Sequence, residues 1–151
     1  MPSPQDYMQF ALIEAQKAAQ IDEIPVGCVI VNPATDEIIA AAHNHNQHSF
    51  DTTAHAEILA IRSACDVLQQ PRLWDMDIYV TLEPCAMCAA AISFARIRRL
   101  YFGAFDEKGG NVVNGTQFFN QKICHHKPEV YGGILQEPCS QILKRFFQAK
   151  R

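Results

Sequence analysis

The sequence predicts an α/β fold whose mixed sheet has an N-terminal antiparallel hairpin followed by parallel strands. Apolar runs of strand length alternate with longer segments whose apolar residues recur at helical spacing. A strand, a helix and a second strand also follow one another between residues 77 and 103, the order of a right-handed crossover between parallel strands. At 151 residues and 48% hydrophobic content, the chain is expected to form one domain, residues 1–151, with a sizeable core.

The first predicted elements carry no evident chemistry. A helix is predicted from Pro4 to about Gln20, because a proline is tolerated in a first turn and the apolar residues that follow keep helical spacing. Residues 26–31 are a continuous apolar run, which is typical of a strand covered on both faces. After a turn, residues 37–42 are predicted to form the return strand of the hairpin.

The middle of the chain is predicted to alternate between helix and strand. The expected elements are, in order, a polar loop over residues 43–52, a helix from residue 55 that ends before residue 71, a strand over residues 77–81, an alanine-rich helix over residues 84–96 and a strand over residues 99–103. Cys85 therefore lies just beyond the carboxyl end of a strand, which is where open α/β sheets place their ligands.

The last third of the chain has weaker patterns. Residues 106–127 lack periodicity but are too long for a bare connection, and a short helix is predicted near Thr116. A short strand over residues 129–131 and a final helix over residues 140–150 follow. On pattern alone, Phe146 and Phe147 in this helix are expected to pack in the core.

Three residues have the types and spacing of zinc ligands. Cys85 and Cys88 are three apart at a predicted helix start, so both sulfurs face the same way, and a helix N-terminus lowers the pKa of a thiol. His55 would supply a third ligand. Because His55 and Glu57 would diverge in mid-helix, they too are expected at a helix start. Three protein ligands leave one tetrahedral position open, as in a catalytic site with one Zn²⁺ per chain.

The segments His55-Ala56-Glu57 and Pro84-Cys85-Ala86-Met87-Cys88 resemble the signature of the zinc deaminases. More narrowly, the chain resembles the bacterial tRNA wobble-adenosine deaminases over nearly its whole length. The further matches are residues 23–27, Asn44, residues 81–85 and 103–108, Cys139, Phe146 and Phe147. The resemblance implies a three-layer α/β/α, cytidine-deaminase-like fold and a homodimer.

The same resemblance implies hydrolytic deamination of adenosine to inosine at the wobble position of a tRNA anticodon stem-loop. Zinc would supply hydroxide at neutral pH to attack the amine-bearing ring carbon, and Glu57 would shuttle the proton. Asn44, Val26 and Asp106 correspond to substrate-binding positions. The residues that correspond to a platform for the anticodon loop are Lys144, Arg145, Phe146 and Phe147.

Two other functions are compatible with many of these residues. A structural zinc module closed by Cys124 or His126 would bind a partner, but such a module has no need of Glu57 beside a ligand. A deaminase of a free base or nucleoside, such as guanine, cytosine or cytidine, would share the zinc core. Phe105 also stands where an arginine is expected in the tRNA enzymes. Residues 124–126 could suggest a second metal site, but the sequence offers no further ligands at a suitable spacing from them.

Composition restricts the possible partners and the compartment. A net charge of −3 and a pI near 6.0 count against a broad basic surface, although basic residues crowd the C-terminus. No apolar run approaches the length of a membrane span, and the start of the chain has no targeting pattern. Six cysteines in such a chain indicate metal ligands and buried thiols rather than disulfides. A cytoplasmic protein is therefore expected.

Overall fold

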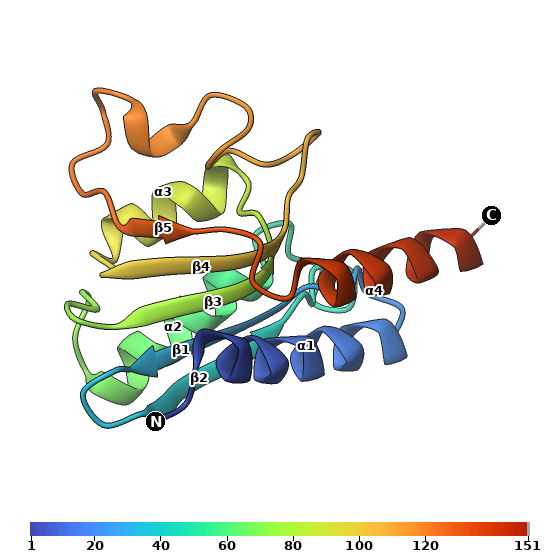
Figure 1. Cartoon of the computed structure of the whole chain (residues 1–151), viewed down its shortest axis with the longest axis horizontal. Helices are drawn as coiled ribbons and strands as arrows, with labels where there is room; N and C mark the ends of the chain where they lie inside the picture. The colour runs from blue at the N-terminus through green and yellow to red at the C-terminus, as the bar shows by residue number, and fades with distance from the viewer. Residues whose placement is uncertain (151) are drawn as a thin grey trace.

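The computed structural model describes residues 1–150, and Arg151 lies outside the described residues. Within them lies a five-stranded sheet of order β2-β1-β3-β4-β5 (Figure 1). The strands are β1 (Gly27–Asn32), β2 (Glu37–His43), β3 (Asp77–Leu82), β4 (Arg99–Ala104) and β5 (Glu129–Tyr131). β1 pairs antiparallel with both β2 and β3, whereas β3, β4 and β5 are parallel. The predicted mixed sheet is confirmed.

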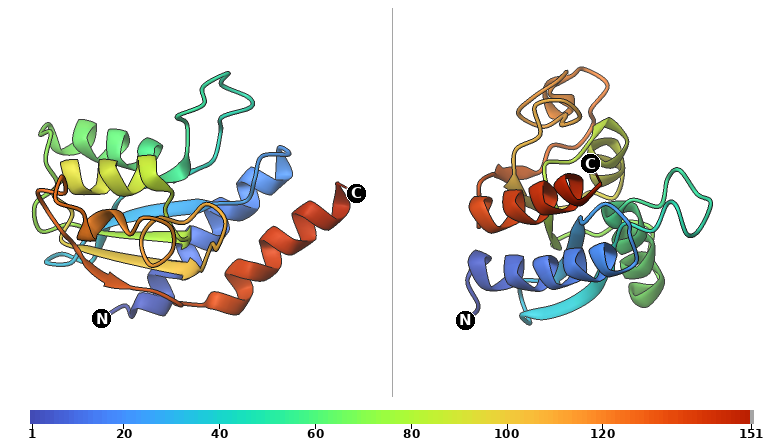
Figure 2. Two further views of the ribbon diagram at one scale, coloured as in Figure 1. Left: turned by 90° about the horizontal axis from the view of Figure 1, so that it is seen from above. Right: turned by 90° about the vertical axis from the view of Figure 1, so that its right-hand side faces the viewer.

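Helices cover both faces of the sheet. The helices are α1 (Pro4–Gln20), α2 (Ala56–Leu68), α3 (Ala86–Phe94) and α4 (Gln136–Ala149). α1 and α4 lie on one face and α2 and α3 on the other (Figure 2). Successive residues of β1 point to opposite faces, so Val29 packs in the core under α1 whereas Ile30 belongs to the core under α2 and α3. The expected three-layer α/β/α fold is confirmed.

α1 and α4 approach the sheet closely at two glycines. A Cβ atom added at Gly27 would collide with the backbone oxygen of Ala11 in α1, and one added at Gly103 would collide with Sγ of Cys139 in α4. Cys139 is itself fully buried. A larger residue at either glycine would push a helix off the sheet, which is costly in a close-packed core. These contacts hold α1 over β1 and α4 over β4.

α3 is shorter than the prediction of residues 84–96. Cys85 is its N-cap and has an extended backbone, so Pro84 precedes the helix instead of lying in its first turn. At the other end, Arg96 has a left-handed φ of 61°, which ends the helix before the next strand.

The last third of the chain also differs from the prediction in its boundaries. α4 starts at Gln136 rather than Ser140, because Pro138 lies in the first turn, where a missing N–H costs no intrahelical bond. The short helix expected near Thr116 is a single 3₁₀ turn, η1 (Phe118–Asn120). The short strand over residues 129–131 is confirmed as β5.

All six cysteines are unpaired thiols. Cys28 is fully buried in β1, and burial raises the pKa of its thiol, which is consistent with the predicted inert core residue. Among residues 1–150, no helix combines the length and the apolar character needed to cross a membrane.

Candidate active site and metal centre

Two helix starts meet at one point of the structure. His55 is the N-cap of α2 and Cys85 is the N-cap of α3, while Cys88 lies in the first turn of α3. Neither N-cap side chain bonds to the backbone of its own helix, so both are free to bind another group. The expectation that His55 and Glu57 lie at a helix start is confirmed, since Glu57 is the second residue of α2.

The spacing of the three side chains fits a shared metal ion. Nδ1 of His55 lies 3.5 Å from Sγ of Cys88 and 3.7 Å from Sγ of Cys85. The three atoms all lie within 4.8 Å of one another. A nitrogen and a sulfur bound tetrahedrally to one zinc ion, at about 2.1 and 2.3 Å, would lie roughly 3.6 Å apart. The residues present therefore fit zinc with three protein ligands.

The two thiols share a hydrogen bond, which raises the pKa of the donor Cys88 and lowers that of the acceptor Cys85. The hydrogen bond from Cys88 lowers the pKa of Cys85 to about 4, and contact with His55 acts in the same direction. Because the thiolate is the form of cysteine that binds metal, Cys85 is in its binding form at neutral pH.

The Cys124–His126 segment does not close the metal site. Sγ of Cys124 lies 3.5 Å from Oγ of Ser93 in α3 and donates to the backbone oxygen of His126 at 3.1 Å. Nε2 of His126 lies 2.7 Å from the backbone oxygen of Ile97. In the described part of the chain, His55, Cys85 and Cys88 are the one group with metal-binding geometry. The segment thus fastens a loop to α3, and the structural zinc module lacks its fourth ligand.

A pocket of about 170 Å³ opens next to the three ligands. Its lining residues are Ile24, Val26, Asn44, Asn46, His55, Glu57, Leu82, Glu83, Cys85, Asp106 and Gly109. Drug-sized ligands occupy pockets of roughly 300–1,000 Å³, so this one suits a smaller group such as a single base. The structure brings together all three residues that the sequence suggested for substrate binding, Val26, Asn44 and Asp106.

Glu57 is almost fully buried in this pocket, with 4% of its surface exposed. Burial raises the pKa of its carboxyl group to about 7, because a low-dielectric environment disfavours the charged form. A group with such a pKa can both accept and release a proton near neutral pH.

Asn44 links the loop after β2 to the start of α2. Its Oδ1 accepts a hydrogen bond from the backbone N–H of Ala56 at 2.9 Å. A backbone N–H can only donate, so this contact identifies the oxygen of the amide and leaves Nδ2 as the remaining donor. One acceptor site of Asn44 is therefore committed to the protein.

Asp106 has a local role in the loop that follows β4. Its Oδ1 accepts hydrogen bonds from the backbone N–H groups of Lys108 at 3.2 Å and Gly109 at 3.0 Å. The second carboxylate oxygen has no such partner among these contacts. The neighbouring Phe105 packs edge-to-face on Phe102, with ring centroids 5.0 Å apart, so this side chain anchors the loop instead of presenting a cation.

Glu83 is a buried site residue that the sequence reasoning missed. It is 2% exposed, and its carboxylate accepts five hydrogen bonds from the loop after β4. A glutamate between an apolar strand and Pro84 was the available signal, but its partners are 23 to 31 residues away in the sequence. Burial opposes its ionisation, yet hydrogen bonds from Asn114 and its neighbours hold the pKa of Glu83 below its ordinary value.

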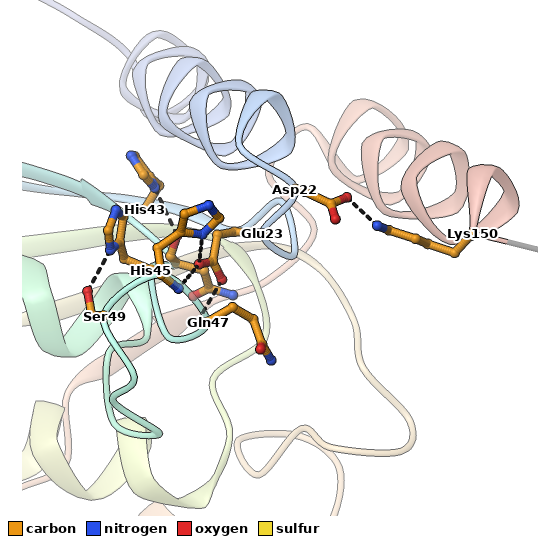
Figure 3. A network of polar contacts seen from close by, with 9 residues as sticks. Asp22, Glu23, His43, His45, Gln47, Ser49 and Lys150 are labelled. Atoms are coloured by element: carbon orange, nitrogen blue, oxygen red, sulfur yellow. Dashed lines mark hydrogen bonds and ion pairs between the residues drawn. The ribbon is translucent and has the colours of Figure 1, made fainter.

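A second buried carboxylate, Glu23, holds the loop on the other side of the pocket (Figure 3). Glu23 is fully buried, although its neighbour Asp22 is exposed. It accepts hydrogen bonds from the backbone N–H groups of Gln47 at 3.2 Å and His48 at 2.8 Å, and it lies 2.6 Å from Nδ1 of His48. The loop histidines are engaged in such protein contacts, and none joins the metal ligands.

The second half of α4 presents aromatic and basic side chains. Phe147 is 47% exposed, so the expectation that it packs in the core is wrong, while Phe146 is half-buried against it. Nζ of Lys150 lies 5.3 Å from the centroid of the Phe146 ring and pairs with Asp22 (Figure 3). Through that pair, the end of α4 lies next to the segment that holds Glu23.

Comparisons with known proteins agree with this site. Residues 1–104 match the family model of the cytidine and deoxycytidylate deaminase zinc-binding region. A tRNA-specific adenosine deaminase of Agrobacterium fabrum is 53% identical, over 96% of this chain and 94% of that protein.

Two solved structures resemble this chain to different degrees. One, from work on A-to-I editing by tRNA:A34 deaminases at the wobble position of transfer RNA, superposes with a TM-score of 0.88 at 53% identity. It covers 91% of this chain and 98% of that one. The guanine deaminase of Bacillus subtilis superposes with a TM-score of 0.63 at 32% identity, over 96% of this chain and 91% of that one. The similarity to the tRNA deaminase is greater in both sequence and structure.

Proposed function

We propose that this chain, which belongs to the cytidine and deoxycytidylate deaminase family and within it to the tRNA-specific adenosine deaminases, converts adenosine to inosine at the wobble position of a tRNA anticodon loop. The observation that carries the proposal is a base-sized pocket lined by Glu57, by Asn44 and by two of the three zinc-fitting residues, His55 and Cys85, with Cys88 buried beside them. The reaction consumes water and releases ammonia.

The residues divide the chemistry between them. His55, Cys85 and Cys88 would hold zinc, which supplies a nucleophile at neutral pH by lowering the pKa of water to about 7. Glu57 accepts one proton of the attacking water and delivers it to the ring nitrogen beside the attacked carbon. It then passes the second proton of that water to the amino group, which leaves as ammonia. Its pKa of about 7 suits both directions of transfer.

Three pocket residues would hold the base. Asn44 uses its free Nδ2 to donate a hydrogen bond to an acceptor atom of the purine, in an orientation set by its bond to Ala56. Val26 packs its apolar side chain against the ring. Asp106 offers its second carboxylate oxygen to a donor of the nucleotide, while Oδ1 keeps the loop in shape.

Binding of the anticodon stem-loop would extend beyond the pocket to α4. The exposed Phe147 offers a ring for stacking on an unpaired base, and Lys144 and Arg145 offer charges for phosphates. Because the whole chain carries a net charge of −3, this local cluster would have to supply much of the attraction for the backbone.

We also propose that residues 1–151 form a single deaminase domain, which works as a homodimer in the cytoplasm. The outer face of α3 is the candidate dimer surface, since Phe94 is 70% exposed and lies on the same helix as the exposed Ala86. Such an apolar face is costly in a monomer. Six unpaired cysteines suit a reducing compartment. Sedimentation of wild type and Phe94→Glu tests the dimer, which should dissociate in the variant.

The test of the reaction is an ammonia-release assay with purified, zinc-loaded protein. An anticodon stem-loop containing adenosine is compared with the same stem-loop containing guanosine at that position, and with guanine, cytosine, cytidine and free adenosine. We expect the adenosine stem-loop to be turned over and the free bases and nucleosides to react poorly. The rate on the stem-loop should fall as salt rises, because phosphate contacts release counterions. Efficient turnover of guanine or cytosine with no reaction on the stem-loop would replace the tRNA function with a free-base deaminase.

A further inference from the structure

The loop from Asp106 to Asn114, here called the 106–114 loop, forms one wall of the pocket and has no regular secondary structure. Both of its ends are tied to one carboxylate, that of Glu83 at the end of β3. Oε1 of Glu83 accepts from the backbone N–H of Asp106 at 3.1 Å and from Nδ2 of Asn114 at 2.7 Å. Oε2 accepts from the backbone N–H groups of Val112, Val113 and Asn114 at 3.1, 2.9 and 3.0 Å.

We propose that Glu83 is a positioning residue for the substrate: its carboxylate holds the 106–114 loop so that Asp106 and Gly109 are in place before the substrate arrives. This inference rests on the function proposed above. A loop of irregular backbone loses conformational entropy when it is ordered. If the loop is already ordered when the protein folds, this entropy cost does not reduce the free energy of substrate binding.

Glu83 acts through the loop and not on the base itself. A carboxylate has about four lone-pair sites, and five donors already point at this one. Although Glu83 lines the pocket and is 2% exposed, its acceptor sites are all taken by the loop. Glu57 remains the carboxylate of the pocket that can exchange a proton.

The backbone of the loop fits closely over the carboxylate. A Cβ atom added at Gly110 would lie 2.5 Å from Cδ of Glu83 and 2.5 Å from the backbone oxygen of Asp106. A glycine is therefore required where the middle of the loop crosses Glu83. Substitution of Gly110 would displace the same loop without altering the carboxylate or any residue near Cys85 in the sequence.

The experiment compares four single variants of the zinc-loaded protein and the double variant Glu83→Gln/Asn114→Ala. Glu83→Gln places an amide opposite backbone donors, Asn114→Ala removes one donor, and Gly110→Ala lifts the loop. Asp77→Asn is the matched control. Asp77 is another buried carboxylate, it accepts two hydrogen bonds from Arg98, and neither residue belongs to the loop or lines the pocket. Zinc content, amide hydrogen exchange over residues 106–114, kcat and KM are measured for each.

We expect Glu83→Gln to keep its zinc, to exchange the amides of the 106–114 loop faster and to raise KM about tenfold or more, with a smaller change in kcat. Gly110→Ala should raise KM in the same way. Asn114→Ala should have a smaller effect alone and no added effect in the Glu83→Gln background, because the two groups act as one unit. Asp77→Asn should leave loop exchange and KM unchanged.

Two results would overturn the inference. One is faster loop exchange in Glu83→Gln with an unchanged KM, which would make the bonds purely structural. The other is an unchanged KM in both Gly110→Ala and Asn114→Ala, which decides the matter even if Glu83→Gln loses zinc. Inactivity of the wild-type protein on the stem-loop would instead count against the proposed function. In that case the same KM comparison is made with the free base that the protein does turn over.

Discussion

Replacing Glu57 with Gln separates proton transfer from metal binding. The amide has nearly the same size and shape as the carboxyl group, but it cannot accept and release a proton at neutral pH. Glu57 is 4% exposed and does not belong to the ligand group of His55, Cys85 and Cys88. The variant should therefore fold and keep one zinc per chain while its turnover falls.

The size of that fall follows from the other carboxylates in the pocket. General acid–base catalysis contributes about 10²- to 10⁴-fold. Glu83 is saturated by five hydrogen bonds, while Oδ1 of Asp106 holds the turn to Gly109 and its other oxygen is assigned to a donor of the nucleotide. Neither can replace Glu57, so the loss should lie in the upper half of the range. We expect kcat to fall about 10³- to 10⁴-fold, equivalent to roughly 4 to 5.5 kcal/mol in the barrier.

The assay is single-turnover deamination of the stem-loop, together with elemental analysis and thermal unfolding. Removing a buried carboxyl group relieves its desolvation, so the melting temperature should not fall. Glu14→Gln is the control, because Glu14 is another buried glutamate, 8% exposed on α1, and does not line the pocket. A zinc-loaded Glu57→Gln protein with kcat within tenfold of wild type would refute the proton-shuttle assignment.

Cys88→Ala should lose zinc and activity together. A chelator should lower the melting temperature of wild type but not of this variant, because zinc bound to the native state stabilises the wild-type fold. Gly103→Ala should destabilise the fold by about 1–3 kcal/mol through its clash with Cys139, which corresponds to a melting temperature about 2–12 °C lower by calorimetry. Burial opposes the ionisation of Glu23, but hydrogen bonds from His48 and Gln47 hold its pKa below the ordinary 4.5. The ionised Glu23 therefore stabilises the fold above pH 4.5, and this stabilisation is lost as the pH falls through the lowered pKa. Urea unfolding at pH 7 and pH 4 should therefore show a smaller acid-dependent loss in Glu23→Gln than in wild type.

The zinc ligands and Glu57 could be predicted from the sequence because their geometry is local. His55 and Glu57 are two residues apart, and Cys85 and Cys88 three apart, so once each pair is assigned to a helix start the directions of the side chains follow. The strands and helices were predictable for a related reason, since burial imposes a period of two or 3.6 on the sequence. The ends of α3 could not be predicted in this way, because they depend on the cap at Cys85 and the left-handed backbone of Arg96.

Only the tertiary structure decided which polar residues hold the pocket together. Glu23 and Glu83 carry no periodic signal, and their hydrogen-bond partners lie 23 to 31 residues away, so neither burial nor charge satisfaction could be read from their neighbours. The exposure of Phe147 likewise depends on where α4 leaves the sheet, which is set by contacts such as that of Cys139 with Gly103. The sequence alone indicated the metal, the candidate reacting groups and the order of the elements. Each ligand pair is local, and the resemblance to the zinc deaminase signature joined the two pairs although His55 and Cys85 are 30 residues apart. The walls of the pocket arise from segments that meet only when the sheet has formed.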